Sequence, residues 1–136
     1  MREHKFRAWN STLKEMNNVM SIHWHNGVVV RIIMSKLGVE DILSEGWFDI
    51  KGEGLKKVKL IEWTGLKDKN GKEIYEGDLI KLETPTMPFS NGLVQEVKFE
   101  DFSWYLCGGI RHSLSVPNSV KLEVIGNIYE NPDLLK

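Results

Sequence analysis

The stretch "TGLKDKNGKEIYEGDLIKL", residues 64–82, holds two turn signals between apolar segments. Asn70-Gly71 favours a tight turn at the tip of a hairpin, because both residues tolerate positive φ angles. Gly77 predicts a second turn directly before the strand-like sequence "DLIKL". We therefore interpret this stretch as two turns of a β-scaffold.

The charges of the same stretch raise two alternatives, a calcium loop and an acid–base site. A calcium loop needs oxygen ligands at its first and last positions, but aligning Gly71 with the loop glycine puts Leu66 and Gly77 there. Three carboxylates follow the first turn: Glu73, Glu76 and Asp78. They lie among lysines, whose positive field lowers a carboxyl pKa. We interpret them as surface charges that flank the turns.

The rest of the chain shows the alternation that is typical of half-buried strands. "HKFRAW" puts Phe6 and Ala8 on one face, and Asn26-Gly27 joins "VMSIHWH" to "VVVRIIM" as a hairpin. Further strand-like segments are "KKVKLIEWTG", "DLIKLE", "LVQEVKFE", "FSWYLC" and "KLEVIGNIY". We also expect a short helix at 36–45, an exposed loop at 83–92 and a final helical turn in "NPDLLK". The predicted fold class is mainly β, with minor α.

Composition limits the class of protein. Cys107 is the only cysteine, so no intrachain disulfide can form, which fits a reducing cytosol. The net charge of −1 gives no basic excess to attract nucleic acid. The start of the chain lacks an apolar signal-peptide core, and no apolar run is long enough to span a membrane. We expect a cytosolic protein without membrane contact.

Charge is unevenly distributed along the chain. Residues 51–81 contain eight lysines and six carboxylates, whereas residues 82–136 contain four basic and seven acidic residues. One interpretation is a solvated surface of mixed sign. The other is that the basic and acidic regions meet between protomers of an oligomer.

Metal and nucleophile sites have weaker signals. His23 and His25 share one strand face at a spacing that some metal sites use, but a third ligand would have to come from elsewhere, such as another protomer. Cys107 and His112 are close in sequence, but a buried apolar cysteine is the simpler interpretation. We predict no metal, no other cofactor and no catalytic residue.

Aromatic residues suggest a ligand surface. The chain has five tryptophans, whose usual role is to fill cores and interfaces. Trp104 and Tyr105, with Lys98 and Arg111 nearby in sequence, form the candidate ligand or partner surface, because aromatic faces beside cations can stack on bases.

Three segments together resemble the YopX family of small phage and prophage proteins: "KFRAWN" at 5–10, "TGLKDKNGKEIYEGD" at 64–78 and "LEVIGNIYENPDLL" at 122–135. The family commonly has Asp where Asn10 stands, a change that a turn tolerates. The resemblance implies a C-terminal SH3-like β-barrel that begins near residue 55, and an N-terminal portion involved in oligomerisation. It implies no catalytic or binding residues.

We therefore expect two portions, an N-terminal β-rich oligomerisation portion at 1–54 and an SH3-like β-barrel at 55–136. The expected function is that of a non-enzymatic phage or prophage accessory protein, a homo-oligomeric binding module in the cytoplasm of the host cell. A host protein or a small nucleotide is a further candidate partner. The alternatives are a counter-defence sponge that sequesters a signalling nucleotide at protomer interfaces, and a single-stranded nucleic-acid binding protein.

Overall fold

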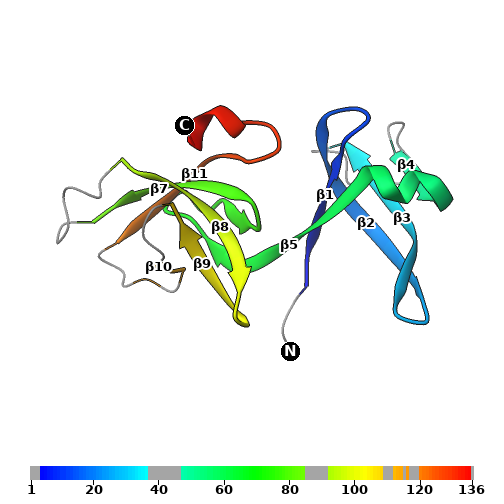
Figure 1. Cartoon of the computed structure of the whole chain (residues 1–136), viewed down its shortest axis with the longest axis horizontal. Coiled ribbons are helices and arrows are strands. Elements are labelled where there is room, and N and C mark those ends of the chain that lie inside the picture. Colours follow the sequence, from blue (N-terminus) through cyan, green and yellow to red (C-terminus); the bar gives the residue numbers. More distant parts are fainter. Residues whose placement is uncertain are drawn as a thin grey trace. The chain divides into compact units, whose positions relative to one another are not determined.

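The structure is a computed structural model that describes residues 4–36, 47–84, 92–108, 112–114, 116 and 120–135. Its elements are almost all antiparallel strands (Figure 1). The strands are β1 (Phe6–Asn10), β2 (Glu15–His25), β3 (Val28–Lys36), β4 (Trp47–Lys51), β5 (Val58–Lys67), β6 (Glu73–Tyr75), β7 (Asp78–Glu83), β8 (Val94–Glu100), β9 (Ser103–Cys107), β10 (His112–Ser113) and β11 (Lys121–Asn127). Two short 3-10 helices are η1 (Gly52–Lys57) and η3 (Pro132–Leu135). The expected mainly β class is confirmed.

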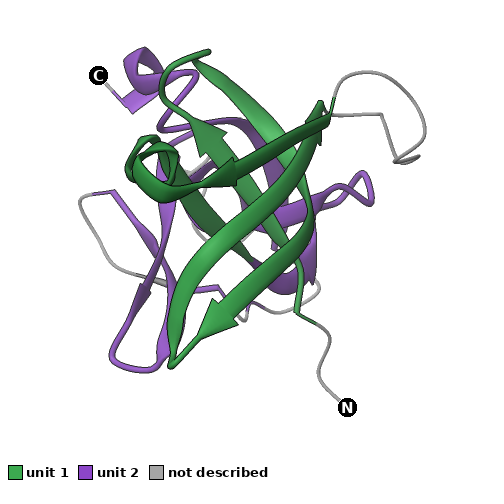
Figure 2. Ribbon diagram, turned by 90° about the vertical axis from the view of Figure 1, so that its right-hand side faces the viewer, with its two compact units in different colours: residues 1–62 green, residues 63–136 purple. Residues whose placement is uncertain are grey.

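The chain divides into two compact units, residues 1–62 and residues 63–136 (Figure 2). The division falls inside β5 and not at residue 54, where we expected the boundary. The first half of β5 pairs with β1, from Val58 opposite Asn10 to Glu62 opposite Phe6. Its second half pairs with β6 in the second unit. One strand is therefore shared by both units.

Unit 1 is an antiparallel sheet with the strand order β4-β3-β2-β1-β5. Asn26 and Gly27 join β2 to β3 with φ angles of 50° and 79°, the left-handed geometry of a tight hairpin turn. The buried centre of the unit consists of Ala8, Ile32 and Met34, against which half-buried side chains from β2, β3, β4, β5 and η1 pack.

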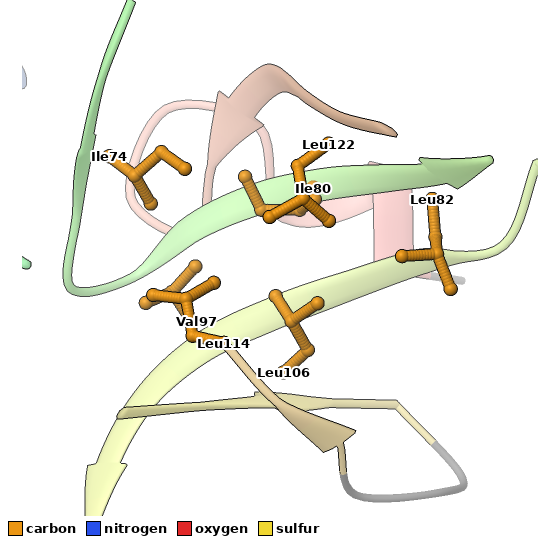
Figure 3. Close-up of a cluster of buried hydrophobic side chains, with 7 residues drawn as sticks. All are labelled: Ile74, Ile80, Leu82, Val97, Leu106, Leu114 and Leu122. Carbon is orange, nitrogen blue, oxygen red and sulfur yellow. The ribbon is translucent and has the colours of Figure 1, made fainter. Parts of the chain in front are cut away.

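Unit 2 contains a five-stranded antiparallel sheet with the order β10-β9-β8-β7-β11. Among the described residues β10 and β11 are its two edges, so these strands do not form a closed barrel. The sheet surrounds one apolar cluster, which Figure 3 shows: Ile74, Ile80, Leu82, Val97, Leu106, Leu114 and Leu122. The SH3-like architecture stays a prediction.

Several smaller expectations concern the helices and loops. The helix predicted at 36–45 lies outside the described residues, apart from Lys36, which ends β3. The centre of the predicted loop, at 85–91, also lies outside them. The predicted final helical turn is η3. In the part of the chain that is described, no helix has the length and apolar character needed to cross a membrane.

Candidate binding surfaces

The first turn of the charged stretch is organised around the Asp68 carboxylate. Its Oδ1 accepts hydrogen bonds from the backbone N–H groups of Asn70, at 2.8 Å, and Lys72, at 2.9 Å. Its Oδ2 accepts one from the backbone N–H of Val124 on β11, at 2.9 Å. Gly71 completes the turn with a φ of 80°. Asp68 is only 8% exposed, so this carboxylate ties the turn to a strand that is distant in sequence.

The same hydrogen bonds shift the Asp68 pKa. Burial raises the pKa of a carboxyl group, but here the three backbone N–H donors and the Lys72 charge outweigh it, and the pKa of Asp68 lies below its usual value. A carboxyl whose pKa is lower in the folded state than in the unfolded state stabilises the fold above its unfolded pKa of about 4. This stabilisation disappears as the pH falls toward the folded-state pKa.

We therefore predict an acid-dependent difference between the wild-type protein and Asp68→Asn. The difference in free energy of unfolding is expected to be constant above about pH 5 and to shrink steadily below about pH 4. Urea unfolding followed by tryptophan fluorescence at a series of pH values measures it. A difference that stays constant down to pH 3 would contradict the assignment of Asp68 as the titrating group.

The second turn, between β6 and β7, is also buried. Asp78 Oδ2 accepts a hydrogen bond from the backbone N–H of Tyr75 at 2.8 Å, and Asp78 is only 4% exposed. The interpretation of Asp78 as a surface charge is therefore wrong. Gly77 has a φ of 82° and donates its N–H to Val97 O, while its own carbonyl accepts from Ile128 N. The turn thus lies between β8 and the segment that follows β11.

That C-terminal segment is folded around Asn127. Asn127 Oδ1 accepts hydrogen bonds from the backbone N–H groups of Tyr129, at 3.0 Å, and Glu130, at 2.8 Å. Its Nδ2 donates to Glu130 Oε2 at 2.7 Å. Val124 of β11 meets the first turn of the charged stretch, and Ile128 in the segment after β11 meets the second. Two of the three recognised motifs, at 64–78 and 122–135, therefore form one hydrogen-bonded assembly that supports the fold.

The four residues of the predicted ligand surface are not gathered on one face. Lys98 lies opposite Tyr105, and Phe99 lies opposite Trp104, so alternation puts these pairs on opposite faces of the β8–β9 ladder. Trp104 packs against the apolar cluster of unit 2. Lys98 and Tyr105 share the other face, and Arg111 lies outside the described residues.

The remaining candidate site residues are the histidine pair and the cysteine. His23 and His25 are exposed on β2, and their Nε2 atoms lie 3.3 Å from Ser21 Oγ and 3.4 Å from Asn26 Nδ2. Cys107 is a half-buried free thiol on β9, opposite Glu96. No three His, Cys, Asp or Glu side chains converge as a metal site within the described ranges.

A surface that the sequence interpretation missed lies at the end of the β2–β3 hairpin. β1 pairs with β2 only as far as Asn18, and β4 pairs with β3 only as far as Arg31. Residues 23–30, here called the β2–β3 arm, form a two-stranded ribbon beyond both neighbours. The arm exposes large apolar side chains: Trp24 at 58%, Val28 at 64% and Val30 at 42%. The sequence signal that could have revealed this surface is the run of three consecutive valines, which interrupts the alternation of apolar and polar residues expected of a half-buried strand.

These features define a two-unit, mainly β protein in which the charged stretch at residues 64–82 serves the fold. The model of the YopX family, described as "YopX protein", matches residues 5–136, so the chain belongs to the YopX family. This confirms the resemblance seen in the three motifs.

Two solved structures are similar over nearly the whole chain. Protein EF1440 from Enterococcus faecalis is 26% identical, with a TM-score of 0.63 and 100% of both chains covered. Protein yopX from Bacillus subtilis is 20% identical, with a TM-score of 0.64, and the match covers 97% of this chain and 98% of that one. The second likeness shows a shared fold. No curated protein matches the chain.

Proposed function

We propose that this YopX-family chain is a non-enzymatic accessory protein that acts as a homo-oligomeric binding module in the cytosol of the host cell. In this proposal unit 1 is the oligomerisation portion, and unit 2 is an SH3-like barrel. The observation that carries the proposal is the β2–β3 arm, which extends past both neighbouring strands and exposes Trp24, Val28 and Val30.

Exposure of the arm to water is energetically unfavourable. A two-stranded ribbon is marginally stable by itself, and within the described residues no strand pairs with either outer edge of the arm. Unpaired strand edges and clustered apolar side chains both favour association with another chain. A second copy that covers the arm would bury Trp24 and the two valines and would supply backbone partners.

The arm exposes an apolar side chain on each of its two faces. Trp24 lies opposite Val29, which packs against the buried centre of unit 1, so Trp24 continues that face outward. Val28 lies opposite His25 on the other face. Because exposed apolar side chains lie on both faces of the ribbon, a partner that surrounds the arm would cover more of them than a flat contact on one face.

We predict that Trp24→Ser combined with Val28→Thr weakens self-association. Lost apolar contact is expected to raise the dissociation constant of the oligomer at least about tenfold. Sedimentation velocity over a series of concentrations measures this. Leu66→Ser is the matched control, because Leu66 is an apolar residue of unit 2 with 41% exposure. A wild-type protein that is monomeric at high micromolar concentration would overturn the proposal.

A further inference from the structure

The hairpin between β8 and β9 has an unusual turn. Glu100 and Ser103 are paired, so only Asp101 and Phe102 form the connection. Both have left-handed backbone angles, with φ of 49° and 62°. Such turns favour Asn and Gly, and a phenylalanine in this conformation is strained. Folding alone would select a different residue at 102.

Phe102 is also almost entirely in water. It is 97% exposed, and the nearby Phe99 is 49% exposed. Phe99 packs against Trp104 with ring centroids 4.9 Å apart and an interplanar angle of 60°. Residues 99–104, here called the β8–β9 tip, therefore combine a fixed aromatic pair with a projecting aromatic side chain. The projecting ring adds little to the stability of its own chain, whereas aromatic side chains commonly anchor interfaces.

The tip is acidic. Residues 99–104 contain Glu100 and Asp101 and no basic residue. This charge repels the phosphates of nucleic acids and of anionic lipid, so the tip is suited to an apolar protein surface without negative charge.

The β2–β3 arm has that complementary character. The sequence from 16 to 39 contains no Asp or Glu. Arg31 at the base of the arm is paired with Asp49 by two hydrogen bonds of 2.7 Å. Lys51 lies opposite Arg31 on β4 and leaves this face with a net positive charge. The arm is therefore apolar and without an acidic residue, with Lys51 near its base, and the tip is apolar and acidic.

We infer that the β8–β9 tip of one copy docks on the β2–β3 arm of another copy, with Phe102 packed against Val28 on the face of the arm that adjoins Arg31 and Lys51. The inference rests on the proposed function and identifies the surface that covers the arm. The contact joins two different surfaces, so two reciprocal contacts close a symmetric dimer, whereas repeated single contacts form a ring or a filament.

Photo-crosslinking tests the contact directly. A photo-crosslinking phenylalanine analogue is placed at position 102 of the full chain, where the side chain is 97% exposed. Isotope-labelled and unlabelled copies are mixed, and crosslinked peptides are identified by mass spectrometry. We expect crosslinks between labelled and unlabelled copies that join position 102 to residues 23–30. Crosslinks only within one copy, crosslinks to other segments, or none would each overturn the inference.

Sedimentation of Phe102→Gly separates this inference from the proposed function. Glycine fits the left-handed turn, so the variant is expected to fold and to melt at or above the wild-type temperature. Its dissociation constant is expected to rise at least about tenfold, while Phe102→Tyr, which keeps the ring, stays near wild type. If Phe102→Gly assembles like wild type while the arm variant dissociates, the inference fails and the proposed function stands. If neither variant changes assembly, both fail.

Discussion

Replacing Asp68 by Asn is expected to lower the free energy of unfolding by about 3 kcal/mol. The carboxylate accepts three backbone hydrogen bonds, and Asn can offer only one oxygen in its place. If that oxygen keeps the bonds from Asn70 and Lys72, the amide NH2 faces the Val124 N–H, so two donors meet and neither is satisfied. Urea unfolding at neutral pH measures the loss.

Asp133→Asn is the matched control for this variant, because Asp133 is an exposed aspartate in η3. Surface substitutions of this kind usually change stability by less than about 0.5 kcal/mol. A similarly small loss for Asp68→Asn would mean that the turn at Gly71 does not depend on the anchor to β11. The interpretation of the charged stretch as scaffold would then lose its main support.

Gly126→Ala is expected to cost about 2 kcal/mol, because the space beside Gly126 is filled. A Cβ at this position would lie 2.8 Å from Asn131 Cγ and would contact Asn131 Oδ1 even more closely. Asn131 would have to move, although its Oδ1 accepts a hydrogen bond from Asn127 N at 3.3 Å. Thermal or urea unfolding measures the effect.

A double-mutant cycle shows whether the cost arises from that contact. Asn131→Ala removes the obstructing side chain, so Gly126→Ala is expected to cost clearly less in its presence than alone. Gly54→Ala is the control glycine, because a Cβ there meets only Ile50 Cγ2, at 3.4 Å. Strictly additive losses from the two substitutions would show that Gly126 is needed for another reason.

Local sequence predicted the strands and turns of this fold well. Asn26-Gly27 lies at the turn of the first hairpin, and "DLIKLE" and "FSWYLC" correspond to β7 and β9. These features depend on residues that are close in sequence, where turn chemistry and period-two alternation act directly. The two motifs at 64–78 and 122–135 were likewise visible, although their contact was not.

Features that depend on distant partners could not be predicted. Asp68 accepts a hydrogen bond from Val124, which is 56 residues away, so its burial has no local signal. Trp104 and Tyr105 are adjacent, but only the pairing of β9 with β8 shows which of them packs against the core. The exposure of the β2–β3 arm depends on where β1 and β4 stop pairing, and register of this kind is set by the whole sheet.

The shared strand β5 affects how this protein can be divided or recombined. Independent modules are usually joined by an exposed linker, where insertions and exchanges are tolerated. Here the division at residue 62 falls within ten continuous strand residues, Val58–Lys67. A cut at this point would leave the pairing with β1 in one half and the pairing with β6 in the other, each on a short fragment of β5 that has lost its continuation. Chimaeras between relatives should therefore inherit β5 intact, together with the residues that pair with both of its halves.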